Sequence, residues 1–412
     1  MSRRQVDPSP EILQQALVTH LEERIHIRDR RILDAFRTVP RHRFVTHVSI
    51  EEAYRDRAIA TKQLDSGIAI SSASQPAMMA MMLEQLDLQP GHRVLEIGAG
   101  TGYNAALMAH LVGANGHVVT MDYDEDIVLD ARQHLAANGI ENVEVIRADG
   151  GLGCPHSAPF DRIILTVGAW DIAPAWREQL AAHGRLVLPL SVGGPQLAVA
   201  FQAQDGHLMS QSAYYCEFMR LRGAHAGPER LGPLGSKKGF LIGNEAALPV
   251  PDDTIYDWLK GPSQECSAGM QIALRDIRLS LWFWLGMYET GHVRIYAAGQ
   301  KAKHRRIPDL LSASVPGHVL RGTSGLVNAD GICLLSRSDD EANPFSLRLR
   351  SYGRAEALTQ RLLARLQAWD AAGRPPGDRL EITVYPRDAV IDVPEGAVVM
   401  PKRWHQLVLR WP

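Results

Sequence analysis

The hydrophobic pattern between about residues 90 and 222 alternates short apolar runs with stretches of helical periodicity. Apolar runs of this length, bounded by glycine or charged residues, are typical of buried β-strands. Strands that alternate with helices predict an α/β fold with a doubly wound, parallel β-sheet. The runs predicted as strands are 94–97, 117–122, 143–148, 160–166 and 184–190.

The pattern changes on either side of this sheet. Residues 1–89 carry two helical apolar patterns, the first starting at Pro10, and we expect them to complete the first domain. Residues 223–236 are rich in glycine and proline and predict a linker. Residues 237–412 predict a second, α+β domain. Within it we expect a helix over 354–369 and strands over 279–285, 380–385 and 406–411.

The first predicted strand runs into a glycine-rich turn that carries the most specific pattern in the chain. Glu96 is followed by Gly98, Gly100 and Gly102, and a helical pattern starts directly afterwards. Glycines at the carboxyl end of a parallel strand let the backbone turn tightly and approach a ligand closely. A dinucleotide-binding turn would need its third glycine at position 103, which is tyrosine. The spacing therefore favours S-adenosylmethionine over NAD.

Acidic residues follow the next two predicted strands. Asp122 lies 20 residues beyond Gly102, where a carboxylate accepts hydrogen bonds from both ribose hydroxyls. Asp149 and Gly150 end the third strand and are expected to hold the adenine amino group. One glycine-rich turn alone fits a plain strand-to-helix connection equally well, but acids at consecutive strand ends argue against that alternative. The predicted cofactor-binding residues are Glu96, Gly98, Ala99, Gly100, Thr101, Gly102, Asp122, Tyr123, Asp149 and Gly150.

Composition and charge narrow the class of protein. A chain of 412 residues is too long for one ordinary core, so two or three domains are expected. Its formal net charge of −2 gives no overall attraction to nucleic acid or membrane. The four cysteines lie far apart, so neither a disulfide framework nor a metal site is expected. We see no signal-peptide core and no apolar run that approaches 18 residues, and we expect a cytoplasmic enzyme.

Four further segments stand in a fixed order around the glycine-rich turn, at 39–45, 53–56, 70–78 and 179–189. Together with that turn they resemble the protein-L-isoaspartate O-methyltransferase family, and the resemblance covers residues 10–222. It implies a class I methyltransferase fold that uses S-adenosylmethionine to methylate a peptide carboxylate. In that family the neighbouring backbone nitrogen then attacks the methyl ester and a succinimide forms. An aspartyl carboxyl, whose ordinary pKa is about 3.9, is already ionised at neutral pH, so we expect no catalytic base.

The segment that binds the acceptor carboxylate in the family departs from the family pattern here. The resemblance implies that Ile70 and Ser71 contact that carboxylate through the backbone and a hydroxyl group. Ala69 replaces the family's threonine, and about two residues are inserted before Pro76. The hydroxyl role therefore falls to Ser71 or Ser74, although Ser74 also fits as the N-cap of the methionine-rich helix that follows. Ser72 and Gln75 complete this part of the predicted substrate site.

A late segment of the first domain is expected to flank the peptide. The resemblance places Met219, Arg220 and Arg222 on a strand beside the substrate, where the two arginines would attract an acidic peptide. The alternative is an ordinary solvated strand face. The basic run 301–306 is a second candidate for an acidic partner, against the alternative of solvated surface.

Two departures from the family shape the functional hypothesis: the altered acceptor segment and an added domain of about 175 residues. A domain that recognises one shaped peptide would explain both. The chain is in this respect similar to relatives in ribosomal peptide natural-product pathways, which methylate a normal aspartate in a macrocyclic peptide and leave an aspartimide. We prefer this hypothesis at the level of sequence. The alternatives are isoaspartyl repair, methylation of a small molecule, and a non-catalytic scaffold that binds S-adenosylmethionine.

Overall fold

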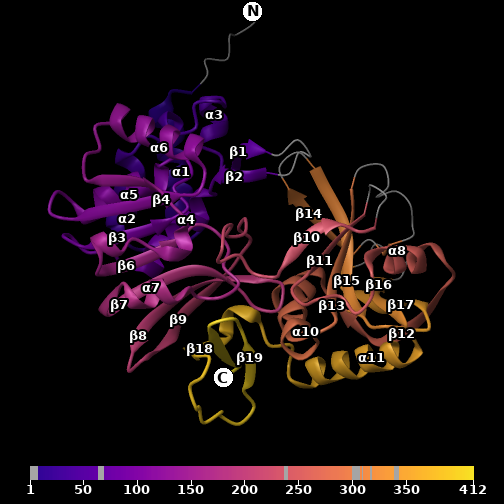
Figure 1. Ribbon diagram of the computed structural model, residues 1–412. Coiled ribbons are helices and arrows are strands. Elements are labelled where there is room, and N and C mark those ends of the chain that lie inside the picture. The colour runs from indigo at the N-terminus through magenta and orange to yellow at the C-terminus, as the bar shows by residue number, and fades with distance from the viewer. Residues whose placement is uncertain are drawn as a thin grey trace, which may run out of the picture.

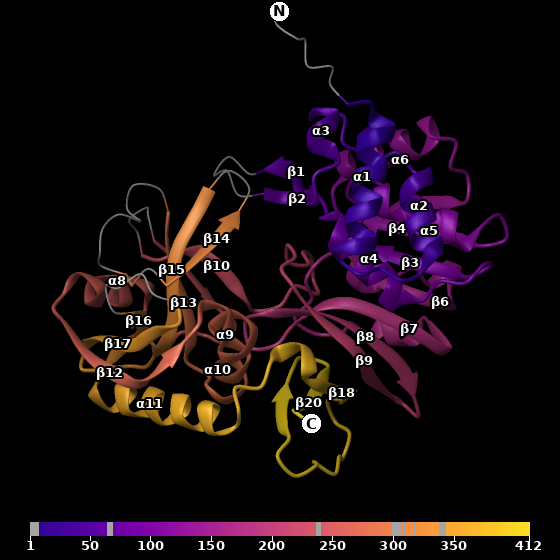
Figure 2. The same cartoon turned by 180° about the vertical axis from the view of Figure 1, so that it is seen from behind.

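The protein consists of two sheet-based halves that lie side by side (Figure 1). The computed structural model describes residues 8–63, 69–235, 240–298, 307–308, 310–315, 318–337 and 343–412. In these residues the first half is built on a ten-stranded sheet and the second on an eight-stranded sheet, and a separate two-stranded hairpin belongs to the first half. Figure 2 shows the same division from behind.

The first sheet has the order β19-β20-β18-β9-β8-β7-β6-β3-β4-β5. Its parallel part contains β3 (Arg93–Ile97), β4 (His117–Asp122), β5 (Val143–Arg147), β6 (Phe160–Leu165) and β7 (Leu180–Ser191). The remaining strands are antiparallel: β8 (Gln196–Gln204), β9 (His207–Cys216), β18 (Glu381–Pro386), β19 (Val398–Pro401) and β20 (His405–Arg410). The five strands predicted from the sequence are therefore the parallel part of a larger mixed sheet.

Both faces of the parallel strands are buried, which is why these strands read as continuous apolar runs. In β3, Val94 belongs to one hydrophobic core and the next residue, Leu95, to the other. The first core is formed with α1 (Pro10–Glu23), α2 (Arg30–Thr38), α4 (Pro76–Leu86), α5 (Tyr103–Val112) and α6 (Glu125–Ala137). The second core contains Trp176 of α7 (Pro174–Glu178). The carboxyl ends of these strands are thereby held at one rigid edge.

The second sheet has the order β10-β11-β13-β15-β16-β17-β12, and β14 pairs with β15. Its strands are β10 (Arg230–Pro233), β11 (Phe240–Asn244), β12 (Ser263–Ile272), β13 (His292–Ala298), β14 (Leu311–Val315), β15 (His318–Val327), β16 (Gly331–Arg337) and β17 (Phe345–Gly353). Helix α11 (Glu356–Ala371) packs on one face and α8 (Asp252–Lys260) on the other. None of the helices in the described ranges has the length and apolar content needed to cross a bilayer.

The apolar run 279–285, predicted as a strand, is helical. A π-helical turn over Ile277–Leu281 continues into α10 (Trp282–Tyr288). Phe283 packs into the core of the first half, whereas Leu285 packs into the core of the second. A helix buried on several sides is apolar all round, so its pattern cannot be distinguished from that of a buried strand.

The division at residues 223–236 and 237–412 also differs from the structure. Strand β10 lies within the predicted linker and already belongs to the second sheet. The C-terminal strands β18, β19 and β20 return to the first sheet, where Thr383 and Val384 pair with β9. This pairing covers an edge of β9 that would otherwise expose unpaired backbone groups. Strand periodicity does not indicate which sheet a strand joins, so the return could not be predicted.

Candidate functional site

The glycine-rich turn lies at the carboxyl end of β3 and leads directly into α5. Gly98, Gly100 and Gly102 all have positive φ angles, of 106°, 51° and 82°. A Cβ atom on Gly98 would lie 2.5 Å from Oγ1 of Thr166, which follows β6. The turn therefore requires glycine for its backbone conformation and, at its first position, for space. Ala99 and Thr101 are buried within the same turn.

Glu96 lies beneath this turn and is completely buried. Its carboxylate accepts hydrogen bonds from Oγ1 of Thr120 at 2.6 Å and from Nδ2 of Asn104 at 2.7 Å. Burial raises the pKa of Glu96 to about 7, although both hydrogen bonds oppose the shift. The side chain thus joins β4 to the start of α5, and its contribution to a cofactor site is to hold the turn in place.

The two predicted acids lie at the ends of the neighbouring strands. Asp122 Oδ2 accepts a hydrogen bond from the Gly100 amide at 3.2 Å, which brings this carboxylate to the turn. Burial raises the pKa of Asp122. Asp149 Oδ1 accepts from the Gly151 amide at 2.9 Å. A Cβ on Gly150 would lie 2.4 Å from Ile97 Cγ2, so this glycine permits the close approach of the β5 end to β3.

These groups form a cradle at the carboxyl ends of three adjacent parallel strands. The positive-φ glycines leave room for a ligand to approach the backbone, and Asp122 and Asp149 supply acceptors at consecutive strand ends. This is the position at which ligands bind in doubly wound sheets. These acceptors fit S-adenosylmethionine, because carboxylates for a ribose diol and an exocyclic amine lie next to a tight glycine turn.

The predicted acceptor segment is one strand of the hairpin β1 (Ile59–Gln63) and β2 (Ala69–Ala73). A Cβ on Gly100 would lie 3.5 Å from the carbonyl oxygen of Ser72, so the hairpin reaches the glycine turn. Ser71 is buried, and its hydroxyl accepts a hydrogen bond from Thr61 Oγ1 at 2.9 Å. Ile70 is half-buried on the same strand. Thr61 was not anticipated, because only the cross-strand pairing reveals it as a partner.

The other predicted serine has a different position. The N-cap of α4 is Gln75, and the helix start is capped by Asp56, whose Oδ1 accepts from the Ala77 amide at 2.8 Å. The Gln75 amide group also donates to Asp56, at 3.0 Å. Ser74 contributes its backbone carbonyl, which accepts from the guanidinium of Arg41 at 2.9 Å. The suggested capping role of Ser74 is therefore wrong, because a distant aspartate supplies the cap.

Arg41 is a buried positioning residue for the acceptor segment. Its guanidinium is fully buried, donates to the carbonyl oxygens of Ala53 and Ser74, and lies 5.1 Å from the ring centroid of Tyr103. Burial lowers the pKa of Arg41. A planar group with several fixed donors can hold two chain segments at once. The same residue thus ties the acceptor segment to the first residue of α5, next to the glycine turn.

Arg222 lies beside the cofactor acids. It forms an ion pair with Asp124 at 3.1 Å, lies 3.9 Å from Asp122, and covers the ring of Tyr123 at 5.6 Å. Lys62 of β1 pairs with the same Asp124 at 2.9 Å. The hairpin and the segment after β9 therefore meet at one carboxylate. Neither Lys62 nor Asp124 was singled out in the sequence.

Met219 and Arg220 form the connection between the two halves. The Met219 carbonyl accepts a hydrogen bond from the Gly168 amide at 2.7 Å, and the backbone of Arg220 forms an isolated parallel β-bridge with Gly168. Burial lowers the pKa of Arg220, and the nearby charges of Glu229 and Glu245 partly oppose this shift. Of the two arginines predicted to face a peptide, one therefore borders the cofactor cradle and the other the interface between the halves. The basic run 301–306 lies outside the described residues.

Comparisons with known proteins agree with this geometry. A sequence profile of the family described as protein-L-isoaspartate(D-aspartate) O-methyltransferase matches residues 12–226. The protein-L-isoaspartate O-methyltransferase of Methanopyrus kandleri is 38% identical over 209 residues, which cover 50% of this chain and 90% of the relative. Protein-L-isoaspartate O-methyltransferase 2 of Archaeoglobus fulgidus is 36% identical over 209 residues, covering 51% and 92%.

A solved structure also resembles the chain beyond its first half. A chain named protein-L-isoaspartate O-methyltransferase aligns with a TM-score of 0.50 and 23% sequence identity, over 90% of this chain and 96% of the other. At this identity the likeness concerns the fold alone. It extends past residue 226, where the family match ends.

Proposed function

The chain belongs to the protein-L-isoaspartate(D-aspartate) O-methyltransferase family, and from this premise we propose that it methylates the free carboxylate of an isoaspartyl residue in a peptide. The class I methyltransferase fold expected from the sequence is confirmed, and S-adenosylmethionine is the methyl donor. The observation that carries the proposal is the contact between the hairpin and the cofactor cradle, where Ser72 meets Gly100.

The cradle supplies the donor side of the reaction. S-adenosylmethionine contributes an electrophilic methyl group. Gly98, Gly100 and Gly102 would allow the donor to lie against the backbone, while Asp122 and Asp149 would fix its nucleoside end. Glu96 acts through the turn that it supports. None of these residues needs to transfer a proton.

The hairpin supplies the acceptor side. A peptide carboxylate is ionised at neutral pH and is itself the nucleophile. The Ser71 hydroxyl accepts a hydrogen bond from the Thr61 hydroxyl. Its own hydrogen is therefore available for a hydrogen bond to the substrate carboxylate. Orienting the carboxylate oxygen in line with the methyl group reduces the entropic barrier, by on the order of 7–11 kcal/mol in favourable cases. Exclusion of water by the hairpin would also partly desolvate the carboxylate and so favour its attack on the methyl group.

The relatives' names favour an isoaspartyl acceptor over the normal aspartate that the sequence hypothesis preferred. A second candidate function is nevertheless supported by one observation. Both views of the molecule place the β1–β2 hairpin, which carries the departures from the family pattern, beside β14 of the second half (Figures 1 and 2). A substrate on this hairpin would meet the second half. The second candidate is therefore methylation of a normal aspartate in one shaped, macrocyclic peptide, followed by aspartimide formation.

Mass spectrometry with S-adenosylmethionine distinguishes the two functions. Three peptides of equal composition serve as substrates: linear isoaspartyl, linear aspartyl, and aspartyl closed into a ring through other side chains. We expect the isoaspartyl peptide to gain a methyl group and then lose methanol as the succinimide forms. The same changes on the cyclic aspartyl peptide alone would establish the second candidate instead. Methylation of none of the three would contradict both.

A further inference from the structure

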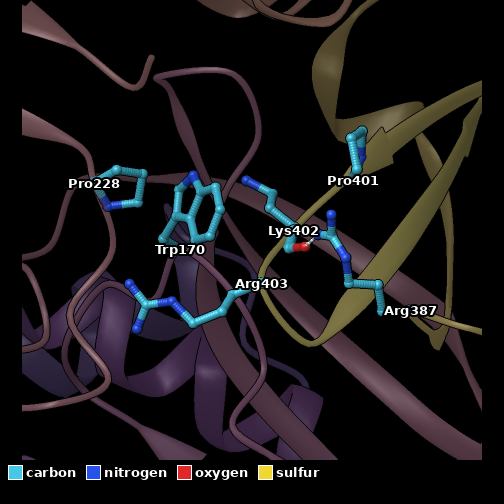
Figure 3. Close-up of a pocket in the computed structure, with 6 residues that line it drawn as sticks. All are labelled: Trp170, Pro228, Arg387, Pro401, Lys402 and Arg403. Atoms are coloured by element: carbon cyan, nitrogen blue, oxygen red, sulfur yellow. Dashed lines mark hydrogen bonds between the residues drawn. The ribbon is translucent and has the colours of Figure 1, made fainter. Parts of the chain in front are cut away.

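A solvent-open pocket lies where the C-terminal strands meet the first half. Its volume is about 330 Å³, near the lower end of small-ligand sites. Figure 3 shows the residues around it, which come from three separate chain segments. They are Trp170 after β6, Pro228 in the connection between the halves, and Arg387, Pro401, Lys402 and Arg403 from the C-terminal strands and their loops.

The pocket is strongly cationic, and two of its cations lack an acidic partner. Lys402 is buried and lies 3.7 Å from Glu245, so its charge is compensated. Arg387 and Arg403 are exposed, and in the described part of the chain no carboxylate lies within ion-pair distance of either. Arg403 donates to the carbonyl oxygens of Ala224 and Ala226, at 3.2 Å each. Arg387 donates to the carbonyl oxygen of Lys402.

These carbonyl contacts fix the two guanidinium groups without neutralising them. A guanidinium carries five donors, and the contacts described occupy at most two of them on either arginine. The nearby Glu229 forms no ion pair with either arginine, and its Oε2 is buried without a hydrogen-bond partner among the described residues. The remaining donors are suited to carboxylates, which guanidinium groups bind in a planar, two-point geometry.

Trp170 gives the pocket an apolar surface. The Lys402 ammonium lies 4.5 Å from the centroid of its ring. Figure 3 shows Lys402 beside Trp170, with Pro228 on the other side of the indole, Arg403 below the ring and Arg387 beyond Lys402. The methylene groups of an acidic side chain could pack on the ring while the carboxylate reaches an arginine.

The pocket lies close to the methyl-transfer centre. Thr166 donates to the Gly98 carbonyl at 2.7 Å, at the glycine turn. Trp170 lies only four residues further along the chain. Four residues span at most about 14 Å, so a short stretch of bound peptide can connect the two places.

We propose that Arg387, Arg403 and Trp170 form a secondary binding site for acidic side chains of the peptide substrate, a few residues away from the carboxylate that is methylated. The proposal rests on the proposed function, in that the substrate is a peptide. It adds a preference for glutamate or aspartate near the methylated residue, which the methyl-transfer centre alone does not provide.

The test compares two labelled peptides that share one isoaspartyl acceptor. One carries glutamates about four to six residues from the acceptor, and the other carries glutamines there. Binding is measured by fluorescence anisotropy in the presence of S-adenosylhomocysteine, and methylation by steady-state kinetics. The double variant Arg387→Gln/Arg403→Gln is compared with Arg410→Gln, a matched change of an exposed arginine that pairs with Glu381 on the same sheet.

We expect wild type to prefer the glutamate peptide up to roughly fivefold in KM and in Kd, the upper end of the range for an exposed ion pair. The double variant should lose this preference with kcat unchanged, and Arg410→Gln should keep it. Added salt should also reduce the preference. Equal KM and Kd for both peptides in wild type, or a preference that survives the double variant, would overturn the proposal.

The two hypotheses fail separately. If wild type methylates neither peptide, the proposed function fails, and anisotropy alone then decides the pocket. Tighter binding of the glutamate peptide that is lost in the double variant would still support the site. Binding that is equal for the two peptides, or unaffected by the variant, would refute it.

Discussion

At the scale of single residues, Glu96 combines two requirements that oppose each other. Its hydrogen bonds to Thr120 and Asn104 hold the glycine turn, but full burial penalises its charge and raises its pKa to about 7. A carboxyl whose pKa is raised by folding favours the folded state most at low pH, where it is protonated in both states. That advantage is lost as the pH rises from about 4.5 through 7.

We therefore predict that Glu96→Gln becomes more stable relative to wild type as the pH rises. The glutamine stays neutral, and its amide can donate to Asn104 Oδ1, which is buried without a partner, once the Asn104 amide turns over. The gap in unfolding free energy should grow by about 2 kcal/mol between pH 5 and pH 8. Urea unfolding at both pH values measures it. The exposed control Glu141→Gln should show no such trend, and a constant gap for Glu96→Gln would contradict the prediction.

The two candidate serines are predicted to respond differently. Ser71 offers its hydroxyl, whereas Ser74 contributes its backbone carbonyl to Arg41. Ser71→Ala should lower kcat/KM for the peptide about tenfold, the value of one hydrogen bond to a charged group, and Ser74→Ala should change it little. Kinetics at saturating S-adenosylmethionine provide the measurement. The reverse order of effects would assign the acceptor contact to Ser74.

Sequence reasoning succeeded for residues whose role is written in their own backbone or in their position at a strand end. The glycines of the turn and the acids Asp122 and Asp149 are of this kind: they lie together as expected, and their contacts to the cofactor stay a prediction. It missed Thr61, because a hydrogen bond across a hairpin depends on register. It misplaced the cap of α4, because Asp56 comes from 21 residues before the amide that it binds.

At the scale of elements, Asp124 links the hairpin to the segment after β9. Lys62 and Arg222 both pair with it, and together they outweigh the effect of burial and lower its pKa. Arg222 also lies 3.9 Å from Asp122, the predicted ribose acceptor. Asp124 thus competes with Asp122 for the same guanidinium.

We predict that Asp124→Asn weakens cofactor binding through this competition. The released Arg222 would move onto Asp122 and occupy its carboxylate. The Kd of S-adenosylhomocysteine should rise several-fold, or by about 1 kcal/mol. Adding Arg222→Gln to Asp124→Asn should restore the affinity. Calorimetry on the wild type, the two single variants and the double variant measures this as a double-mutant cycle. An Asp124→Asn protein that binds normally would show that Arg222 does not interfere.

Helix α11, which has one buried face, was predictable from its periodicity, and the parallel strands were predictable from their short, continuous apolar runs. The helical run that contains Phe283 and Leu285 was not, since it touches both cores and therefore has no polar face. Its neighbours in space, rather than its own pattern, decide between helix and strand.

At the scale of the whole molecule, a buried charge network joins the two halves. The Lys402 ammonium donates to the Ser191 carbonyl at 3.0 Å and lies 3.7 Å from Glu245, which also accepts from the Ser191 hydroxyl. Burial opposes ionisation of Glu245, but the charges of Lys402 and Arg294 and the hydrogen bonds from the Ser191 hydroxyl and the Gly194 amide outweigh it and lower its pKa. Ser191, Glu245 and Lys402 come from β7, from the loop after β11 and from the loop before β20.

We predict that Lys402→Met destabilises the protein by about 3–5 kcal/mol, because Glu245 is left buried without its counter-charge. A second change, Glu245→Gln, should recover most of the loss. Thermal unfolding of both variants measures this. If Lys402→Met alone is as stable as wild type, the network does not hold the halves together.

The domain order was predictable from composition, but the chain path was not. The first passage between the halves lies within the glycine- and proline-rich stretch. The second passage, near residue 380, has no such composition, because there a strand simply joins a different sheet.

The return of β18 to the first sheet has a mechanical consequence. The second half is tethered to the first at two points, by the connection after β9 and by the chain that enters β18. One connection leaves the relative orientation of two bodies free, whereas two connections favour rotation about the line that joins them. Any opening between the halves is therefore expected to follow one hinge rotation, whose axis passes through the two connections.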